Sequence, residues 1–234
     1  MLESQVWWAA PGDVRPRHTR LLDAVERGRR DRYLRVEDRD RFTIGVALTR
    51  LVLGRALGLP PERVPLDRTC PDCGRPHGAP RLPAGTGPYV SISHSGDRIA
   101  LAVSATGPLG VDVEATGGKL DREVAGRVLG PAEMAELERL GTAEWQSGLL
   151  AYWTRKEAVV KATGEGLRVP LTDLHVSAPD QSPRLLAWYG RPELTGRLQL
   201  HALNPGPGYA ACLALIDQPH AAVYETPATD LLGT

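Results

Sequence analysis

The sequence predicts an α+β fold made of two halves of similar size. Apolar residues at helical spacing, followed by strand-like alternation, occur twice along the 234 residues, with a seam near Ser104–Leu109. We therefore expect one half at residues 1–105 and the other at residues 106–234. No residue-level repeat of fixed period accompanies this pattern. A functional site is expected in a cleft between the halves.

The first half is expected to begin with a strand and to continue with helices. The run VWWAA predicts the opening strand. Two apolar stripes at helical spacing follow between Thr19 and Ala56, separated by the charge-dense link ERGRRDRYLRVEDRDR. Residues 61–89 are rich in Pro and Gly and predict turns and short edge strands. Two further strands are expected at YVSIS and RIALAVSA.

The second half begins with a strand, LGVDVEA, and continues with helices and more strands. The longest expected helix ends at Gly164 and Gly166, since glycine commonly ends helices. The expected helices are DREVAGRVL, PAEMAELERL and TAEWQSGLLAYWTRKEAVVKATG. The expected later strands are DLHVSA, RLLAWY, GRLQLHAL, YAACLALI and AAVYET.

Composition narrows the classes of partner. Lys and Arg total 28 and Asp and Glu total 28, so the formal net charge is zero. Nucleic-acid binders usually carry a basic excess, so we expect no nucleic-acid partner. No apolar run approaches the roughly 20 residues that span a bilayer, and no targeting segment is recognisable at the start, so no membrane partner is expected. With only three cysteines, the sequence predicts a cytoplasmic, reduced protein.

The strand LGVDVEA carries two acidic residues that alternate with valines. Strand geometry places Asp112 and Glu114 on one face, where their mutual repulsion favours a bound cation. Mg²⁺ is the natural candidate, because it prefers hard oxygen ligands and leaves positions for a phosphate. The alternative is a half-exposed edge strand with a polar face, since a D-x-E pattern alone is a weak signal.

The stretch WTRKEAVVKATGEGL carries charges on a helix that is apolar nearly all round. Glu157 and Lys161 are four residues apart and share a face, whereas Lys156 lies off that face. An ordinary surface ion pair is one interpretation. A helix so apolar is largely buried, however, and buried charges need partners. A metal ion held by Asp112 and Glu114 would supply a partner for Glu157, and a ligand phosphate would supply one for Lys161.

The run SISHSG places hydroxyls and an imidazole at the end of a strand. Ser93 and His94, with backbone donors of the turn, are suited to contact a phosphate. A serine hydrolase would require a G-x-S-x-G elbow, which is absent. A polar strand end with a satisfied histidine is the alternative.

The run TCPDCGRPHGAP contains a C-x-x-C pair followed by a histidine. Cys70, Cys73 and His77 fall short of the four ligands of a closed zinc site, and Cys212 is distant in an apolar run. A redox pair would be expected at a helix start after a strand, whereas Pro and Gly here indicate a tight hairpin. We interpret the segment as a structured turn, with metal binding as the main alternative.

The runs SISHSG, GVDVE and WTRKEAVVKATGEGL, in this order, resemble one family. They are similar to the 4'-phosphopantetheinyl transferases of the surfactin-synthetase-activating (Sfp) type, and the resemblance covers the length of the chain. The Arg-rich link and the hairpin CGRPHGAP also resemble the actinobacterial members. The resemblance implies a 4'-phosphopantetheinyl transferase fold of two pseudo-symmetric α/β halves, with the active site in the cleft between them.

The resemblance also implies a reaction, that of a holo-[acyl-carrier-protein] synthase type phosphopantetheinyl transferase. The 4'-phosphopantetheine group of coenzyme A, the co-substrate, passes to a serine of an acyl or peptidyl carrier protein, with Mg²⁺ as cofactor and 3',5'-ADP as the second product. Polyketide, nonribosomal peptide or fatty acid synthases would be activated in this way. A monomer is expected, because a duplicated single chain needs no second copy to complete its cleft.

The resemblance assigns roles by position. Asp112, Glu114 and Glu157 would hold Mg²⁺ in the second half, while Glu157 would act as base and Lys161 would stabilise the departing phosphate. The first half would hold the adenosine side of coenzyme A. The expected coenzyme A contacts are Arg29, Arg41, Arg75, Ser93, His94, Lys156 and Lys161.

Two positions depart from the family pattern. Ala79 stands where many relatives carry Lys, which puts one phosphate contact in doubt, and Arg75 is a candidate substitute. Glu26 stands where some relatives carry a second Lys.

Carrier proteins are usually acidic around the modified serine, so a basic docking face is expected. Lys119, Arg122 and Arg127 are candidate contacts, with a solvated helix face as the alternative.

Two other classes of protein remain as alternatives. A metal-dependent nuclease would also gather carboxylates and a lysine around Mg²⁺, but the neutral charge and the Ser-His-Ser turn disfavour it. A non-catalytic coenzyme-A-binding protein would not need three carboxylates together with Lys161.

Overall fold

The computed structural model describes residues 4–118 and 120–233, which form two compact units. One unit is Gly107–Ala222, and the other comprises Met1–Thr106 together with Val223–Thr234. The second half was expected to extend to residue 234, whereas the last segment belongs to the first unit. The reason is the strand β9 (Val223–Pro227), which pairs in parallel with β1 (Ser4–Ala9).

The first unit contains a four-stranded sheet of order β2-β3-β1-β9. The strands β2 (Tyr89–Ser95) and β3 (Arg98–Ser104) form an antiparallel hairpin, and β3 is also antiparallel to β1. The expected strands at the start and before the seam are therefore present. Where short edge strands were expected at 61–89, the described chain forms one isolated bridge between Asp67 and Arg81.

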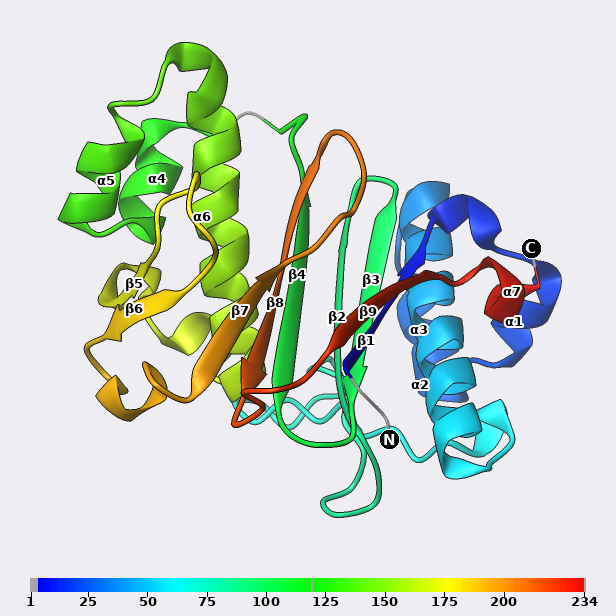
Figure 1. Ribbon diagram of the computed structural model, residues 1–234. Coiled ribbons are helices and arrows are strands. Elements are labelled where there is room, and N and C mark those ends of the chain that lie inside the picture. Colours follow the sequence, from blue (N-terminus) through cyan, green and yellow to red (C-terminus); the bar gives the residue numbers. More distant parts are fainter. Residues whose placement is uncertain (1–3, 119, 234) are drawn as a thin grey trace. The chain divides into compact units, whose positions relative to one another are not determined.

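The long helix α3 (Val36–Leu57) lies beside the sheet of this unit (Figure 1) and contributes to its apolar core. Ile44 and Leu48 of α3 are fully buried in one cluster with Ile99 and Leu101 of β3. The helix ends at Gly58, whose φ of 66° lies in the left-handed region. The shorter helices of the unit are α1 (Pro16–Arg20), α2 (Ala24–Arg30) and α7 (Thr229–Leu232), with 3-10 turns at Pro11–Asp13 and Pro61–Arg63.

The charge-dense link is largely helical, and Glu26, its first residue, is bound by charged residues on either side of the link. Asp23 accepts from the Glu26 backbone N–H at 2.8 Å, and the Glu26 carboxylate accepts from the Asp23 N–H at 2.9 Å, so the two form the cap of α2. Arg50 of α3, only 3% exposed, donates to Glu26 at 2.9 Å and to Asp23 at 3.1 Å. Glu26 is therefore a buried structural anion at the position where some relatives carry Lys.

The second unit packs three helices with a three-stranded antiparallel sheet of order β4-β8-β7 (Figure 1). Its strands are β4 (Leu109–Ala115), β7 (Leu198–Ala202) and β8 (Tyr209–Ile216), with a separate pair formed by β5 (Leu174–Val176) and β6 (Leu185–Trp188). Its helices are α4 (Arg122–Val128), α5 (Pro131–Leu137) and α6 (Thr142–Thr163), with 3-10 turns at Gly166–Arg168, Leu171–Asp173 and Pro192–Leu194. These elements match the expected ones in type and order.

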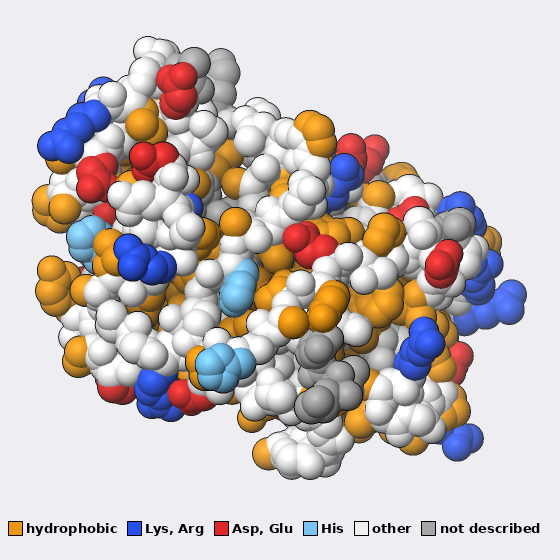
Figure 2. Space-filling model, in the orientation of Figure 1, with side chains coloured by type: hydrophobic (Ala, Val, Ile, Leu, Met, Phe, Trp, Pro, Cys, Tyr) orange, Lys and Arg blue, Asp and Glu red, His pale blue; other side chains and the backbone are white. Residues whose placement is uncertain are grey.

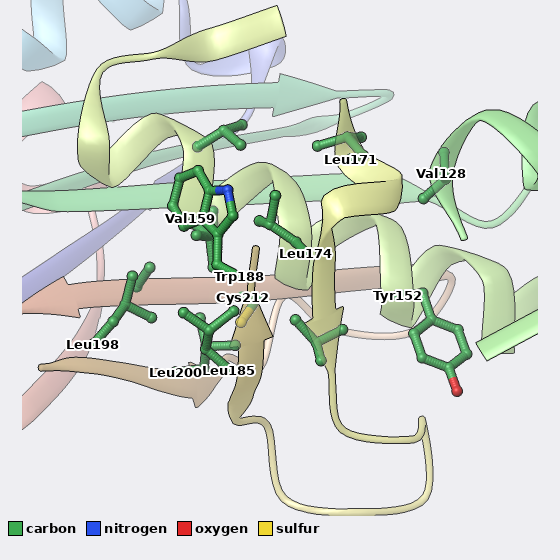
Figure 3. Packing of buried hydrophobic residues seen from close by; sticks show 14 of the residues in the cluster. Val128, Tyr152, Val159, Leu171, Leu174, Leu185, Trp188, Leu198, Leu200 and Cys212 are labelled. Carbon is green, nitrogen blue, oxygen red and sulfur yellow. The ribbon is translucent and has the colours of Figure 1, made fainter. Parts of the chain in front are cut away.

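The core of the second unit lies between α6 and the two sheets (Figure 3). Trp188 and Leu174 face one another in the β5–β6 register and pack in one cluster with Val159 of α6. Cys212 of β8 is 1% exposed in the same cluster, and burial raises the pKa of its thiol to about 12. Trp153 packs at the edge of this core. In the described chain, no helix has the combined length and apolarity needed to cross a bilayer.

Candidate active site

Gly110 permits an unusually close approach of α6 to β4. A Cβ atom on this residue would lie 2.2 Å from the carbonyl oxygen of Ala158 and 2.4 Å from the backbone nitrogen of Ala162. Only glycine fits such a contact, and the facing helix residues are themselves small. Because side chains alternate along a strand, Asp112 and Glu114 lie on the same face of β4 as Gly110 and are directed toward α6.

Asp112 and Lys161 form the central ion pair of this contact. The Nζ atom of Lys161 lies 2.6 Å from Oδ1 of Asp112. The Asp112 side chain is 3% exposed, whereas the Lys161 side chain is 28% exposed. Lys161 lies in the last turn of α6, just before the helix ends at Gly164. A buried carboxylate thus holds a cation that solvent still reaches.

Glu157 lies one turn earlier on α6 and is 9% exposed. Its Oε1 atom is buried and has no hydrogen-bond partner among the described residues. Burial raises the pKa of this carboxyl, the charges of Asp112 and Glu114 raise it further, and Lys161 opposes them. Glu157 is therefore near both strand acids, as the sequence predicts, in an environment that disfavours its charge.

The three acids do not converge as tightly as a metal-bound set. Among the described residues, the group of three ligating side chains whose donor atoms all lie within 4.8 Å is a different one, formed by Cys70, Cys73 and His77. In the acidic cluster the Lys161 ammonium provides the compensating positive charge at Asp112. The convergence of Asp112, Glu114 and Glu157 on one ion stays a prediction.

The first unit brings together several of the residues expected to contact coenzyme A. Arg41 of α3 donates from Nε and from a terminal nitrogen to the carbonyl oxygen of Gly96, at 3.0 and 2.9 Å. Gly96 lies in the β2–β3 turn, two residues after His94, which is exposed, and three after Ser93, which is buried. Arg41 therefore orders the Ser-His-Ser turn.

Arg29 lies next to the start of α3. Its guanidinium is 5.3 Å from the ring centroid of Phe42, the residue after Arg41. Arg75 donates to Cys73 Sγ at 3.5 Å within the hairpin, where Ala79 is also exposed.

Comparison with known proteins identifies the family. Residues 108–214 match the 4'-phosphopantetheinyl transferase superfamily. The 4'-phosphopantetheinyl transferase HetI of Nostoc sp. is 33% identical over 166 residues, which cover 70% of this chain and 68% of HetI. A 4'-phosphopantetheinyl transferase of Bacillus subtilis is 30% identical over 165 residues, which cover 69% of this chain and 70% of that protein. The chain belongs to the 4'-phosphopantetheinyl transferase superfamily.

A solved structure is also similar to this transferase. The crystal structure of Thermotoga maritima holo-acyl-carrier-protein synthase (AcpS) is similar over 47% of this chain and 62% of that chain, with a TM-score of 0.40 and 20% identity.

Lys156 of the transferase is a structural residue, contrary to the sequence-based expectation of a coenzyme A contact. Its side chain is fully buried, and its ammonium donates to Val128 O at 2.7 Å, Glu133 Oε2 at 2.5 Å and Leu171 O at 3.0 Å. All three ammonium protons are thereby used. Burial lowers the pKa of Lys156, while the Glu133 carboxylate opposes this. The expectation failed because Glu133 lies 23 residues away in the sequence.

The candidate docking cations of the transferase already have carboxylate partners. Arg122 pairs with Glu138 at 2.7 Å, and Arg127 pairs with Glu123 at 2.5 Å. Figure 2 shows acidic and basic side chains interspersed over α4 and α5. A groove of about 770 Å³ lies beside them, lined by Leu120, Asp121, Arg122, Glu123, Glu138, Leu140, Thr142, Trp145 and Gln146. Lys119 lies outside the described residues.

Sequence reasoning missed Gly110 of the transferase. It treated the run GVDVE as an acidic pair and gave no role to its first residue. The signal available was a glycine inside a strand, which often marks close approach of another backbone.

Proposed function

We propose that this protein transfers the 4'-phosphopantetheine group of coenzyme A to a serine of an acyl or peptidyl carrier protein, in a Mg²⁺-dependent reaction that releases 3',5'-ADP. The observation that carries the proposal is the placement of Glu157 beside Asp112 and Glu114, with Lys161 on Asp112. The proposal extends to the Sfp-type subclass with pseudo-symmetric halves, and to polyketide, nonribosomal peptide or fatty acid synthases as targets.

The acidic residues fit a magnesium ion in their chemistry. Asp112, Glu114 and Glu157 offer only carboxylate oxygens, which Mg²⁺ prefers. The buried Oε1 of Glu157 has no partner among the described residues, and burial and the charge of Asp112 raise the pKa of this carboxyl, which supports the proposal of a cation at this place. When bound, the ion would withdraw negative charge from the diphosphate of coenzyme A.

The surroundings of Glu157 suit it to accept a proton, and those of Lys161 suit it to stabilise negative charge on a phosphate. A carboxylate with a raised pKa is a more effective proton acceptor, so Glu157 would take the proton of the carrier serine. Lys161 is partly exposed and would donate to phosphate oxygens as negative charge develops on them. Because phosphoryl transfer depends chiefly on positioning and charge neutralisation, these two roles account for most of what the protein must do.

The adenosine side of coenzyme A would be held by the first unit. Arg41 fixes the turn that carries Ser93 and His94, and Arg29 presents a second guanidinium near the same end of α3. Arg75 in the hairpin is the candidate for the phosphate contact that Lys makes in many relatives. A cleft between the halves, a monomeric state and a cytoplasmic location stay predictions.

The experiment is a transfer assay read by intact-protein mass spectrometry. The protein is incubated with coenzyme A, Mg²⁺ and apo carrier proteins of the fatty-acid, polyketide and peptide types, and one phosphopantetheine group should be added to at least one carrier. Chelation should stop the transfer, and added Mg²⁺ should restore it. Glu144→Gln, an exposed change at the start of α6, is the control for variants of the acidic cluster. Absence of a mass shift on every carrier contradicts the proposal.

A further inference from the structure

The hairpin of the first unit brings three soft metal ligands together. Donor atoms of Cys70, Cys73 and His77 all lie within 4.8 Å of one another. The Sγ atom of Cys73 is 2.9 Å from Nε2 of His77. Both cysteines are free thiols, and Cys73 and His77 are exposed. The proposed phosphopantetheinyl transfer uses none of these groups.

The backbone holds the three donors in place without help from a helix or an extended sheet. The Cys70 N–H donates to the Arg75 carbonyl at 2.8 Å, and the Gly74 N–H donates to the Cys70 carbonyl at 2.9 Å. Gly74 has a φ of 69°, which favours glycine, so the turn after Cys73 depends on this residue. The structure thus folds the C-x-x-C segment into a closed turn with both sulfurs on the same side as His77.

The base of the hairpin is fixed as well. The Gly78 N–H donates to the Arg68 carbonyl at 2.7 Å, and a Cβ atom on Gly78 would meet that oxygen at 3.0 Å. Asp67 and Arg81 form a bridge in which Arg81 Nε donates to the Asp67 carboxylate at 2.8 Å. His77 is therefore carried back toward the cysteines by a constrained backbone, so the ligands are positioned before any ion binds.

We propose that Cys70, Cys73 and His77 bind one Zn²⁺ ion, with water in the fourth position. Two thiolates and one imidazole form a donor set that zinc accepts in three-ligand sites. Cys212 is excluded as fourth ligand, because it is buried in the core of the second unit. Arg75 Nε, 3.5 Å from Cys73 Sγ, would act as an outer partner that supports the thiolate.

A redox-active thiol pair is the competing interpretation of the same residues. Such pairs are found at a helix start, whereas the described hairpin contains no helix around Cys70 and Cys73. His77 at 2.9 Å from Cys73 has no function in a simple disulfide but is a required third ligand for zinc. The geometry therefore favours zinc.

The test is metal binding by the full chain, purified under reducing conditions, stripped with a chelator and then titrated with Zn²⁺ alone. One equivalent should bind in the absence of coenzyme A and Mg²⁺. Substituting Co²⁺ should give the intense visible bands of a tetrahedral site together with thiolate-to-cobalt charge transfer. Neither readout needs a variant or transferase activity, so failure here is distinguishable from failure of the proposed function.

Variants locate the site. Cys73→Ser and His77→Ala should each weaken zinc binding by at least about tenfold, in line with the losses seen for metal-site changes. Cys212→Ala should keep the full stoichiometry, because that thiol lies in the other unit. Failure of the wild-type chain to bind zinc, or a cobalt spectrum without thiolate charge transfer, overturns the proposal. So does zinc binding that is unchanged in Cys73→Ser.

Discussion

Gly110 of β4 and Ala158 of α6 approach so closely that a Cβ atom on the glycine would stand 2.2 Å from the alanine carbonyl oxygen. This approach brings the acidic face of the strand against the charged face of the helix. Asp112 lies two residues beyond Gly110, and Lys161 lies three residues beyond Ala158, which allows their 2.6 Å contact. The geometry of the candidate site thus depends on a residue that carries no functional group.

Gly110→Ala should therefore damage both stability and transfer. The added methyl group must push α6 away from β4, and overpacking of this kind typically costs about 1–3 kcal/mol. We expect the free energy of unfolding to fall by an amount in this range or larger. The rate of phosphopantetheine transfer should fall as well, because Glu157 and Lys161 move with α6. Denaturant unfolding and the mass-spectrometric transfer assay are the measurements.

Gly126→Ala is the matched control for this change. Gly126 lies inside α4, and a Cβ there would meet nothing within 4 Å. Alanine in a helix interior should stabilise the protein by roughly 0.5–1 kcal/mol and leave transfer unchanged. Equal behaviour of the two variants would show that the β4–α6 approach does not matter.

Glu157→Gln should raise the stability of the protein and abolish its transfer activity. The wild-type carboxylate is buried, its Oε1 has no described partner, and Asp112 and Glu114 repel it. A neutral amide of the same shape removes the desolvation and the repulsion, so the melting temperature in the absence of metal should rise. Transfer should be lost, because an amide neither accepts the serine proton nor binds Mg²⁺ well.

The contrary result for Glu157→Gln would be a lower melting temperature with transfer retained. That combination would mean that the carboxylate is a structural anion, stabilised by Lys161, and has no part in catalysis. Measuring Glu157→Gln and wild type with and without Mg²⁺ also reports whether the metal stabilises only the chain that keeps Glu157.

The order of the elements could be predicted from sequence because it depends on local periodicity. The alternation in LGVDVEA and the spacing of four in α6 placed Asp112 with Glu114 and Glu157 with Lys161 on the correct faces. Burial of α6 followed from its apolar composition. These features require only the geometry of a single strand or a single helix.

Features that depend on distant pairing could not be predicted in this way. The last strand was assigned to the second half, because nothing in AAVYET indicates a parallel pairing with β1 more than 200 residues earlier. Arg29 and Arg41 were inferred only by resemblance, and the hydrogen bonds of Arg41 to Gly96 span 55 residues. Local sequence patterns indicate which residues share a face of one helix or strand, whereas tertiary packing determines which residues of other elements they contact.

Lys156→Met should destabilise the second unit without a specific effect on coenzyme A. The change leaves the buried Glu133 carboxylate and two carbonyl groups without their donor. Removing one member of a buried ion pair typically costs about 3–5 kcal/mol. Denaturant unfolding should show this loss, and the double variant Lys156→Met with Glu133→Gln should recover part of it.

The KM of the Lys156→Met variant for coenzyme A, measured under conditions where the variant is folded, should equal that of wild type. A well-folded variant with a raised KM would restore the sequence-based assignment.

His18 should make the first unit less stable in mild acid. The ring is 1% exposed; Nδ1 accepts from the Arg15 N–H at 3.1 Å, and Nε2 lies 3.1 Å from the Leu232 carbonyl of α7. Burial, with Arg17 and Arg15 nearby, lowers its pKa below 6.5, although Leu232 and Asp13 oppose this. The folded state therefore holds His18 neutral, while the unfolded chain takes up a proton below pH 6.5.

The unfolded state thus binds more protons, so this part of the stability is complete above the unfolded pKa. It is lost as pH falls below 6.5 toward the lower pKa of the folded state.

The measurement is the free energy of unfolding at a neutral and a mildly acidic pH, for wild type and for His18→Asn. Asparagine can still accept from the Arg15 N–H but does not titrate. The variant should be less stable than wild type at neutral pH and should lose less stability on acidification, since the other titrating groups are common to both chains. An identical loss in the two chains would show that folding does not lower the pKa of His18, which contradicts the prediction.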